Sequence, residues 1–220
     1  MEIIPAIIPE DLDDLGRKIA LVDGLTEVIQ IDITDGMFVP SKSWPFNDRL
    51  WNDGVRAELP YCDQCEFEFD LMVNNPKELA KEYDKLGAKR VIVHVESFDK
   101  KEDLDELIDR ADCQAEVGLA FNIDTPLDDY LEVIKKVSFV QIMGIKKIGF
   151  QGQKFSTESV DKVRELKRKV PGVVVSVDGG VNLENAKLLS EAGVDRLVSG
   201  SSIYESGDIE ETIKKFQGLS

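Results

Sequence analysis

The chain alternates eight times between a short apolar segment and a longer stretch, usually with the apolar spacing of a helix. The exception is the connection after the second segment, which is long and passes through Trp44 and Trp51. Near-continuous apolar strands that alternate with amphipathic helices are typical of a parallel sheet covered by helices. Eight such units in 220 residues favour a closed (β/α)8 TIM barrel of the α/β class over a doubly wound open sheet. The apolar segments are 3–8, 28–34, 66–73, 91–95, 117–122, 139–143, 173–178 and 196–199.

No linker or low-complexity stretch interrupts this alternation, so residues 1–220 are predicted to form one domain. The net charge of −16 argues against nucleic-acid binding and against docking on an anionic membrane. The chain has no run of about 18 apolar residues, and its beginning does not resemble a signal peptide. Three cysteines are consistent with a reducing compartment. Together these features predict a cytoplasmic protein.

The second apolar segment carries a polar side. Period-two geometry places Gln30, Asp32 and Thr34 on one side of a strand that ends at Asp35-Gly36, a strong turn signal. Ligands bind at the carboxyl ends of parallel strands, so this strand end is a candidate site. The alternative from this segment alone is a strand end that faces water.

The other strand ends supply further polar and methionine side chains. Asp32 and Asp178 stand on strands two and seven, so they can face one small ligand from two directions. Such a pair suits two-base chemistry, in which one group removes a proton and the other returns one to the opposite face. The remaining strand-end candidates are Asp70, Met72, His94, Glu96, Asn122 and Met143.

Glycines after the last two strands indicate where a phosphate would bind. Gly179-Gly180 follows strand seven and Gly200-Ser201 follows strand eight, the loops that usually hold phosphate in this fold. The long, locally basic loop 144–153 is predicted to be a mobile lid over a phosphorylated substrate. The alternatives are ordinary turn glycines and a solvated surface loop.

His94 is the only histidine, and both it and Glu96 are expected to point into the barrel. A hydrogen-bonded structural histidine is the preferred interpretation. Metal ligation would need carboxylates from other strands to converge on the site.

These residues belong to longer segments through which nearly the whole chain resembles the ribulose-phosphate 3-epimerase family. That resemblance implies a (β/α)8 barrel that interconverts ribulose 5-phosphate and xylulose 5-phosphate, with Asp32 and Asp178 as the two acid/base residues. It also implies that Met72 and Met143 form an apolar shelf. By the same resemblance, the phosphate contacts are Gly179, Gly180, Gly200 and Ser201, under a loop that spans Gly149 and Gly152. The matching segments are 32–40, 71–76, 93–96, 118–120, 149–155, 177–181 and 198–201.

The chain departs from the family pattern within the site. The family's metal site resembles two histidines and two aspartates that hold a divalent ion such as zinc, whereas Gln30 and Asp70 stand at the two histidine positions here. Three converging carboxylates without a cation would repel one another, and at least one would stay protonated. With a cation, Asp32, Asp70, Asp178 and Gln30 form an all-oxygen set that suits Mg2+, Mn2+ or Ca2+ better than Zn2+.

Smaller departures lie around these positions. Ala6 replaces the family's serine, and Thr34 replaces one of its methionines. The lid has an extra residue and carries Ile148 in place of a proline. If no cation binds, Lys146 or Lys147 of the lid could stabilise negative charge instead.

Three functions compete on this basis. The first is a ketose-phosphate 3-epimerase, an isomerase that acts on a phosphorylated ketose through an enediolate. The second is a phosphosugar-binding barrel that has lost metal and turnover. The third is a Mg2+-dependent lyase or aldol-type enzyme, whose relatives resemble Asp-x-Lys-x-x-Asp where this chain has Asp32-Ile33-Thr34-Asp35. Apolar loops such as 38–40 could form a contact in a homo-oligomer. The epimerase is the preferred interpretation.

Overall fold

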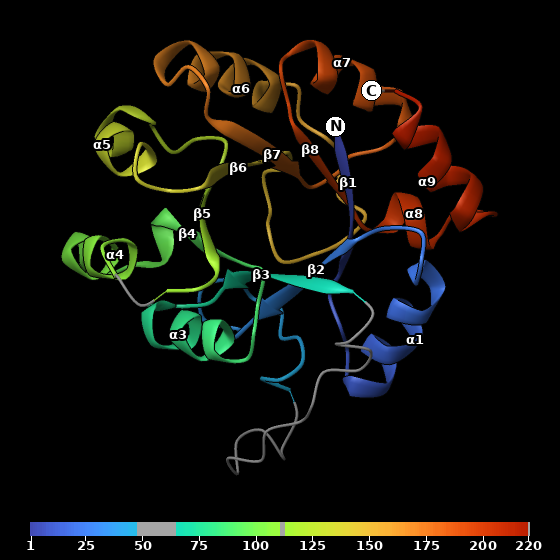
Figure 1. Ribbon diagram of the computed structural model, residues 1–220, viewed down its shortest axis with the longest axis horizontal. Coiled ribbons are helices and arrows are strands. Elements are labelled where there is room, and N and C mark those ends of the chain that lie inside the picture. Colours follow the sequence, from blue (N-terminus) through green and yellow to red (C-terminus); the bar gives the residue numbers. More distant parts are fainter. Residues whose placement is uncertain (48–64, 111–112, 220) are drawn as a thin grey trace.

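The computed structural model describes residues 1–47, 65–110 and 113–219 (Figure 1). Eight parallel strands close into a barrel in chain order, and β8 pairs back with β1. This closed barrel confirms the predicted TIM fold. The strands are β1 (Glu2–Ile7), β2 (Val28–Thr34), β3 (Glu66–Met72), β4 (Arg90–His94), β5 (Glu116–Phe121), β6 (Phe139–Met143), β7 (Val174–Asp178) and β8 (Arg196–Ser199).

Helices surround the barrel on the outside, as Figure 1 shows. The α-helices are α1 (Leu12–Val22), α3 (Lys77–Lys85), α4 (Lys101–Ile108), α5 (Leu131–Ile134), α6 (Glu158–Lys169), α7 (Leu183–Glu191), α8 (Ser201–Tyr204) and α9 (Ile209–Gln217). The short 3-10 helices are η1 (Val95–Ser97) and η2 (Asp128–Tyr130). Within the described ranges, every helix is too short or too polar to cross a bilayer.

The structure differs from the sequence prediction in a few places. Strand β8 is followed directly by the short helix α8, which begins at Ser201 and precedes α9. The helix expected after strand five consists of η2 followed by the single turn of α5. Trp44 is buried beside the barrel, whereas Trp51 lies outside the described residues.

Helix α1 illustrates how local sequence forms the outer layer. Asp11 precedes the helix, and its side chain accepts a hydrogen bond of 2.7 Å from the backbone N–H of Asp14. This cap satisfies one of the donors that every helix start leaves open. Leu15, Ile19 and Val22 then recur on one face and are completely buried against the barrel. Each such side chain contributes roughly 1.5–3 kcal/mol of burial free energy.

Strand register brings the polar strand ends together. Asp32 of β2 lies directly beside Asp70 of β3, and Asp178 of β7 lies beside Met143 of β6. Parallel strands that start together also end together, so these side chains meet at the carboxyl end of the barrel.

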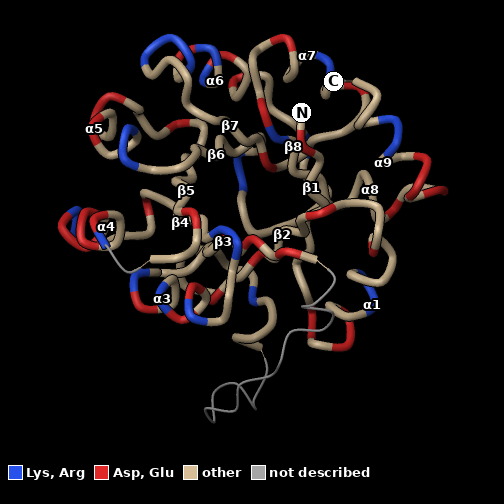
Figure 2. Tube along the Cα trace, viewed as in Figure 1, with Lys and Arg blue, Asp and Glu red and all other residues tan. Residues whose placement is uncertain are grey.

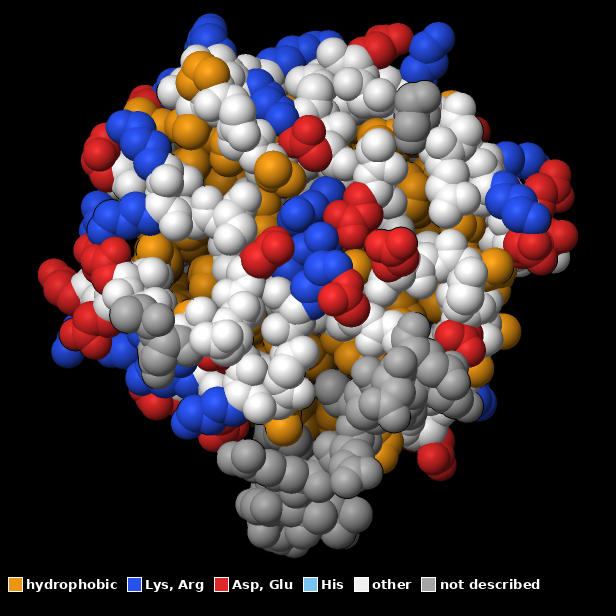
Figure 3. All heavy atoms as spheres, viewed as in Figure 1, with side chains coloured by type: hydrophobic (Ala, Val, Ile, Leu, Met, Phe, Trp, Pro, Cys, Tyr) orange, Lys and Arg blue, Asp and Glu red, His pale blue; other side chains and the backbone are white. Residues whose placement is uncertain are grey.

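The amino end of the barrel carries a different group of charges. Most charged residues lie on the outer helices (Figure 2), but the middle of the face in Figure 3 shows basic side chains surrounded by acidic ones. Arg90 pairs with Glu68 at 2.9 Å, Glu2 at 3.2 Å and Glu116 at 3.4 Å. Arg196 pairs with Glu2 at 3.1 Å. Opposite charges are therefore matched where the strands begin.

Candidate active site

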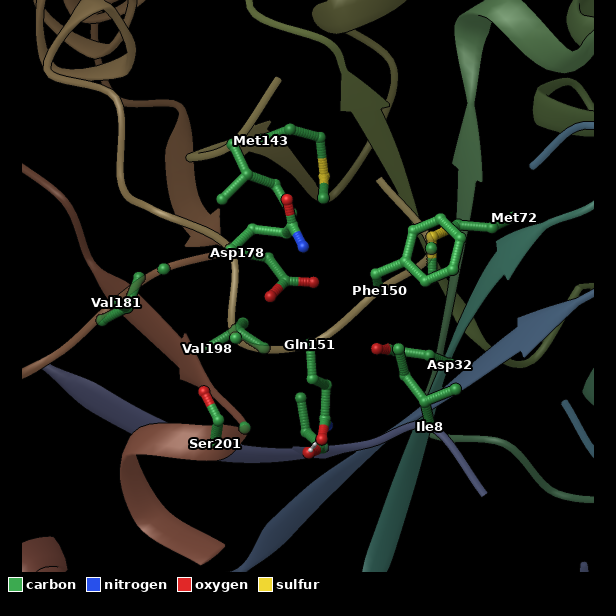
Figure 4. A pocket seen from close by; sticks show the side chains of 18 residues that line it. Ile8, Asp32, Met72, Met143, Phe150, Gln151, Asp178, Val181, Val198 and Ser201 are labelled. Carbon is green, nitrogen blue, oxygen red and sulfur yellow. Dashed lines mark hydrogen bonds between the residues drawn. The ribbon is translucent and has the colours of Figure 1, made fainter. Parts of the chain in front are cut away.

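A cavity of about 480 Å³, including its open mouth, lies at the carboxyl ends of the strands (Figure 4). It contains both residues predicted as acid/base groups and all eight residues predicted to contact the substrate. These ten residues are Asp32, Met72, Met143, Gly149, Gly152, Asp178, Gly179, Gly180, Gly200 and Ser201. The other two residues of the predicted cation set, Gln30 and Asp70, are completely buried and do not line the cavity.

Gln30 connects the two carboxylates that the sequence predicts as acid and base. Its amide nitrogen donates to Asp32 Oδ1 at 2.7 Å and to Asp178 Oδ2 at 2.8 Å. Figure 4 shows that these carboxylates project into the cavity from different sides. One buried amide therefore orients both groups without neutralising either charge.

A second buried amide extends this chain of hydrogen bonds. The Gln141 amide nitrogen donates to Asp70 Oδ2 at 3.0 Å and to Asp178 Oδ2 at 3.5 Å. His94 Nε2 lies 3.1 Å from the other oxygen of Asp70. The His94 ring also packs against Phe38, with ring centroids 5.3 Å apart. The single histidine is thus held by a hydrogen bond and by packing.

Burial and mutual repulsion shift the protonation of these groups. Burial raises the pKa of Asp32 well above its usual range, and the charges of Asp178 and Asp70 raise it further. Burial also raises the pKa of Asp178 to about 7, with a further contribution from Asp70. Burial lowers the pKa of His94, but the neighbouring Asp70 more than offsets this, so the net shift is upward. Near neutral pH the cluster can therefore hold a proton on one aspartate while another is ionised.

The same cluster offers a donor set for a cation. Asp32, Asp70 and Asp178 each bring a carboxylate oxygen within 4.8 Å of the others. The amide oxygens of Gln30 and Gln141 are buried and make no hydrogen bond. A buried amide oxygen without a partner is costly unless something else binds it. Three carboxylates fit a hard divalent ion such as Mg2+ or Mn2+, whereas both amides turn their nitrogens toward these carboxylates and would have to rotate to add their oxygens.

The glycines after β7 allow close approach of backbone segments. Gly179 has φ +104° and Gly180 has φ +68°, conformations that L side chains rarely adopt. A Cβ at Gly180 would lie 2.7 Å from the backbone nitrogen of Phe155, and one at Gly179 would lie 2.7 Å from Ile145. These loops therefore leave backbone exposed at the side of the cavity where the sequence predicts a phosphate.

The predicted lid extends across the mouth of the cavity. Its tip, Phe150-Gln151, is flanked by Gly149 and Gly152, both in the left-handed region at φ +88° and +72°. Ser41 Oγ donates to the backbone oxygen of Gly149 at 2.5 Å, which ties the lid to the loop after β2. Phe150 is 44% exposed, while Gln151 is partly buried inside the mouth.

Two expected residues have other roles. Because β4 ends at His94, Glu96 lies in η1 and no longer follows the strand's alternation. Its carboxylate accepts from the backbone N–H of Asn122 at 2.8 Å and from the Thr125 hydroxyl. Glu96 and Asn122 thus shape the loop after β5, and neither lines the cavity.

Two residues of the site were not anticipated. Gln141 alternates with Met143 on β6, so a polar residue in that otherwise apolar strand was a signal that could have found it. It was missed because it lies one step below the strand end. Gln151 lies on the predicted lid, but spacing along a loop does not indicate which side chain points inward.

Comparison with known proteins places this site in a family. The sequence profile of the ribulose-phosphate 3 epimerase family matches residues 2–204. Ribulose-phosphate 3-epimerase from Bacillus subtilis is 31% identical over 224 residues, which cover 99% of this chain and 99% of that protein. The enzyme of the same name from Mycobacterium tuberculosis H37Rv is 31% identical over 210 residues, or 94% of this chain and 87% of that protein.

Solved structures show the same fold at lower identity. 3-Hexulose-6-phosphate synthase from Salmonella typhimurium superposes with a TM-score of 0.71 at 13% identity, covering 100% of this chain and 98% of that one. Orotidine 5'-phosphate decarboxylase from Pyrococcus horikoshii gives a TM-score of 0.68 at 17% identity, covering 99% and 98%. These matches support the barrel architecture alone.

Proposed function

The chain belongs to the ribulose-phosphate 3-epimerase family, and from this membership we propose that it epimerises a ketose phosphate at C3, with ribulose 5-phosphate and xylulose 5-phosphate as the pair. The observation that supports this most directly is the pair of buried carboxylates on opposite walls of one cavity, bridged by a single amide. The same cavity has glycine-rich backbone on one side, where the phosphate would bind.

The proposed reaction is two proton transfers without a change of oxidation state. The carboxylate of one aspartate takes the C3 proton, which lies next to the C2 carbonyl, and the electron pair forms an enediolate. The protonated carboxyl of the other aspartate gives its proton to C3 on the opposite face, and the carbonyl re-forms. Asp32 and Asp178 fill these two roles because both line the cavity and both have raised pKa values. After one turnover their protonation states are exchanged, and proton exchange with water restores them.

The surrounding residues would orient the substrate and restrict water. Met72 and Met143 present sulfur and methylene groups to the cavity, where they would pack beside the planar enediolate. Gly179, Gly180, Gly200 and Ser201 would bind the phosphate through backbone and hydroxyl groups. Local donors of this kind must overcome the net charge of −16, which repels an anionic substrate.

A divalent cation would be held by Asp32, Asp70 and Asp178, and the amides of Gln30 and Gln141 would add their unpartnered oxygens by turning over. When bound there, it would supply positive charge near the oxygens that become negative in the enediolate. The donor set is all oxygen, so we propose Mg2+ or Mn2+ in preference to Zn2+.

Proton exchange at C3 in deuterated water tests this function. The protein should remove the C3 proton signal of ribulose 5-phosphate in NMR spectra, and Asp32→Asn or Asp178→Asn should slow this exchange by roughly 10²–10⁴-fold, the usual contribution of an acid or base. Asp109→Asn, which changes an exposed carboxylate on the outer surface, is the control and should leave the rate unchanged. No exchange by the wild-type protein with Mg2+, Mn2+ or Zn2+ would refute the proposal.

A further inference from the structure

Gln151 of the lid reaches into the cavity instead of toward solvent. Its amide nitrogen donates to the backbone oxygen of Ala6, near the end of β1, at 3.0 Å. Figure 4 shows this side chain directed away from the lid, with Ser201 on one side and Asp32 on the other. The amide therefore lies between the proposed phosphate site and one of the proposed acid/base residues.

The loop after β8 leaves space for this amide. A Cβ at Gly200 would lie 2.6 Å from Gln151 Nε2 and 3.0 Å from the Ala6 oxygen. Gly200 has φ −98°, so its backbone conformation does not itself demand glycine. The space it leaves is required by the contact between the lid and β1, independently of any phosphate.

The tip of the lid also restricts where Gln151 can go. The hydroxyl of Ser41 binds the backbone oxygen of Gly149, and a Cβ at Gly149 would lie 2.8 Å from Val39. The lid therefore packs tightly against the loop after β2 on this side of its tip. Gly152, on the other side of the tip, has open space around the position of a Cβ. These contacts fix the position of the Gln151 amide in the mouth of the cavity while the lid is closed.

A ligand that spans the cavity must pass this amide. With its phosphate at Gly180 and Ser201 and its reactive carbon between Asp32 and Asp178, the carbons in between face Gln151 and the Ala6 oxygen. In a five-carbon ketose 5-phosphate, that stretch consists of the C4 hydroxyl group and C5. An amide provides one donor and one acceptor group, which suits recognition of a hydroxyl. A six-carbon ketose 6-phosphate would place one more hydroxylated carbon in the same space.

From this arrangement we propose that Gln151 is a specificity-determining residue. Its amide contacts the part of the ligand between the reactive carbon and the phosphate, binds the hydroxyl group there, and favours a five-carbon ketose phosphate because a longer ligand does not fit. The proposal deepens the function above and rests on it for the orientation of the ligand. Gln151 contacts the bound sugar and has no part in the proton transfers.

Variants at Gln151 test this with three ligands. Dissociation constants would be measured by thermal shift for inorganic phosphate and for equilibrated epimer mixtures of ribulose 5-phosphate and of allulose 6-phosphate. Gln151→Ala should weaken binding of the five-carbon ligand about tenfold, as the loss of one hydrogen bond predicts. Gln151→Gly should shift the preference between the two sugar phosphates about tenfold toward the six-carbon ligand. Neither should change the phosphate constant by more than about twofold.

Thr157→Ala is the matched control, because Thr157 is exposed at the start of α6 and its side chain makes no capping hydrogen bond. An unchanged ratio of the two sugar phosphates, or a parallel loss of inorganic phosphate binding, would overturn the specificity role. Proton exchange at C3 separates the two proposals. A wild-type protein that binds with this selectivity but exchanges no proton refutes the epimerase function alone. Normal exchange with an unchanged ratio refutes the role of Gln151 alone.

Discussion

Both ends of the barrel contain buried carboxylates, but the side chains that bind these carboxylates differ between the two ends. At the amino end, Glu68 is 1% exposed, and the guanidinium of Arg90 lies 2.9 Å away. At the carboxyl end, Asp32 and Asp178 are bound by the neutral amide of Gln30. A guanidinium cancels negative charge, whereas an amide satisfies hydrogen bonds and leaves the charge in place.

This difference separates a structural cluster from the one that we propose to be reactive. The amino-end ion pairs bind β1, β4, β5 and β8 together, and Arg196 also packs on the Phe139 ring at 4.5 Å. The carboxyl-end cluster retains charge that a proton or a cation must balance. Burial raises the pKa of Glu68 to about 7 at the amino end, where the arginines oppose the rise, whereas at the carboxyl end the neighbouring aspartates add to it.

The largest expected effect is a loss of stability when an ion pair at the amino end is removed. Arg90→Met should lower the free energy of unfolding by about 3–5 kcal/mol, because it leaves Glu68 buried without its partner. Chemical denaturation would measure the change, with Arg164→Met as the control because that arginine forms an exposed surface pair. A loss below about 1 kcal/mol, the range of a surface ion pair, would show that the amino-end network is not structural.

The next effect has the opposite sign and lies at the carboxyl end. In cation-free protein, Asp178→Asn should raise the free energy of unfolding by about 4 kcal/mol at pH 8 and about 1.7 kcal/mol at pH 5. The folded protein raises the pKa of Asp178 to about 7, so it binds more protons than the unfolded chain between about pH 4 and 7. The contribution of Asp178 to stability therefore falls as the pH rises through this window. The asparagine variant loses this part of the dependence and keeps the part that Asp32 and Glu68 contribute. Melting temperatures at both pH values in the presence of a chelator would measure it.

A pH-independent melting temperature of the wild type over this window, or a variant less stable than the wild type at pH 8, would contradict this explanation. Together with the slowed proton exchange expected for the same variant, the outcome would show that Asp178 costs stability in exchange for reactivity.

The smallest expected effect concerns the cation. Mg2+ or Mn2+ at tenfold above its dissociation constant should stabilise the wild type by about 1.4 kcal/mol. Asp70→Asn should abolish this gain, because it removes one of the three converging carboxylates. Glu116→Gln, at the amino end, should leave the gain intact. Equal stabilisation of the Asp70 variant would place the cation elsewhere on this acidic protein.

Much of the site could be predicted from positions along the chain. Asp32, Asp178 and the glycine pairs stand immediately at strand ends, and in a parallel barrel all strand ends meet at one face. Local spacing is enough to identify such residues. The resemblance to the epimerase family added the expected chemistry, and the family match over residues 2–204 confirms the resemblance itself.

The hydrogen-bond partners of the site residues inside the barrel could not be predicted from local spacing. Gln141 lies next to Asp178 because β6 pairs with β7, and next to Asp70 because the closed barrel places β3 across from β6. The inward direction of Gln151 depends on a lid that is tied to the loop after β2 at Gly149, and on the hydrogen bond of Gln151 to Ala6 of β1. Gln141 and Asp70 are 71 residues apart in the sequence, and Gln151 and Ala6 are 145 residues apart. No pattern of neighbouring residues predicts contacts over such separations.

The sequence by itself determined the eight-fold alternation, and with it the barrel and the face where chemistry occurs, because hydrophobic periodicity is a property of neighbouring residues. Only the tertiary structure decided which buried charges are neutralised. Glu68 and Asp70 are two residues apart on one strand, yet their partners differ. Pairing with β4 gives the first a guanidinium and the second an imidazole, and barrel closure adds an amide from β6 to the second. The protonation and reactivity of a buried carboxylate follow from those partners, and strand register and closure bring the partners within reach.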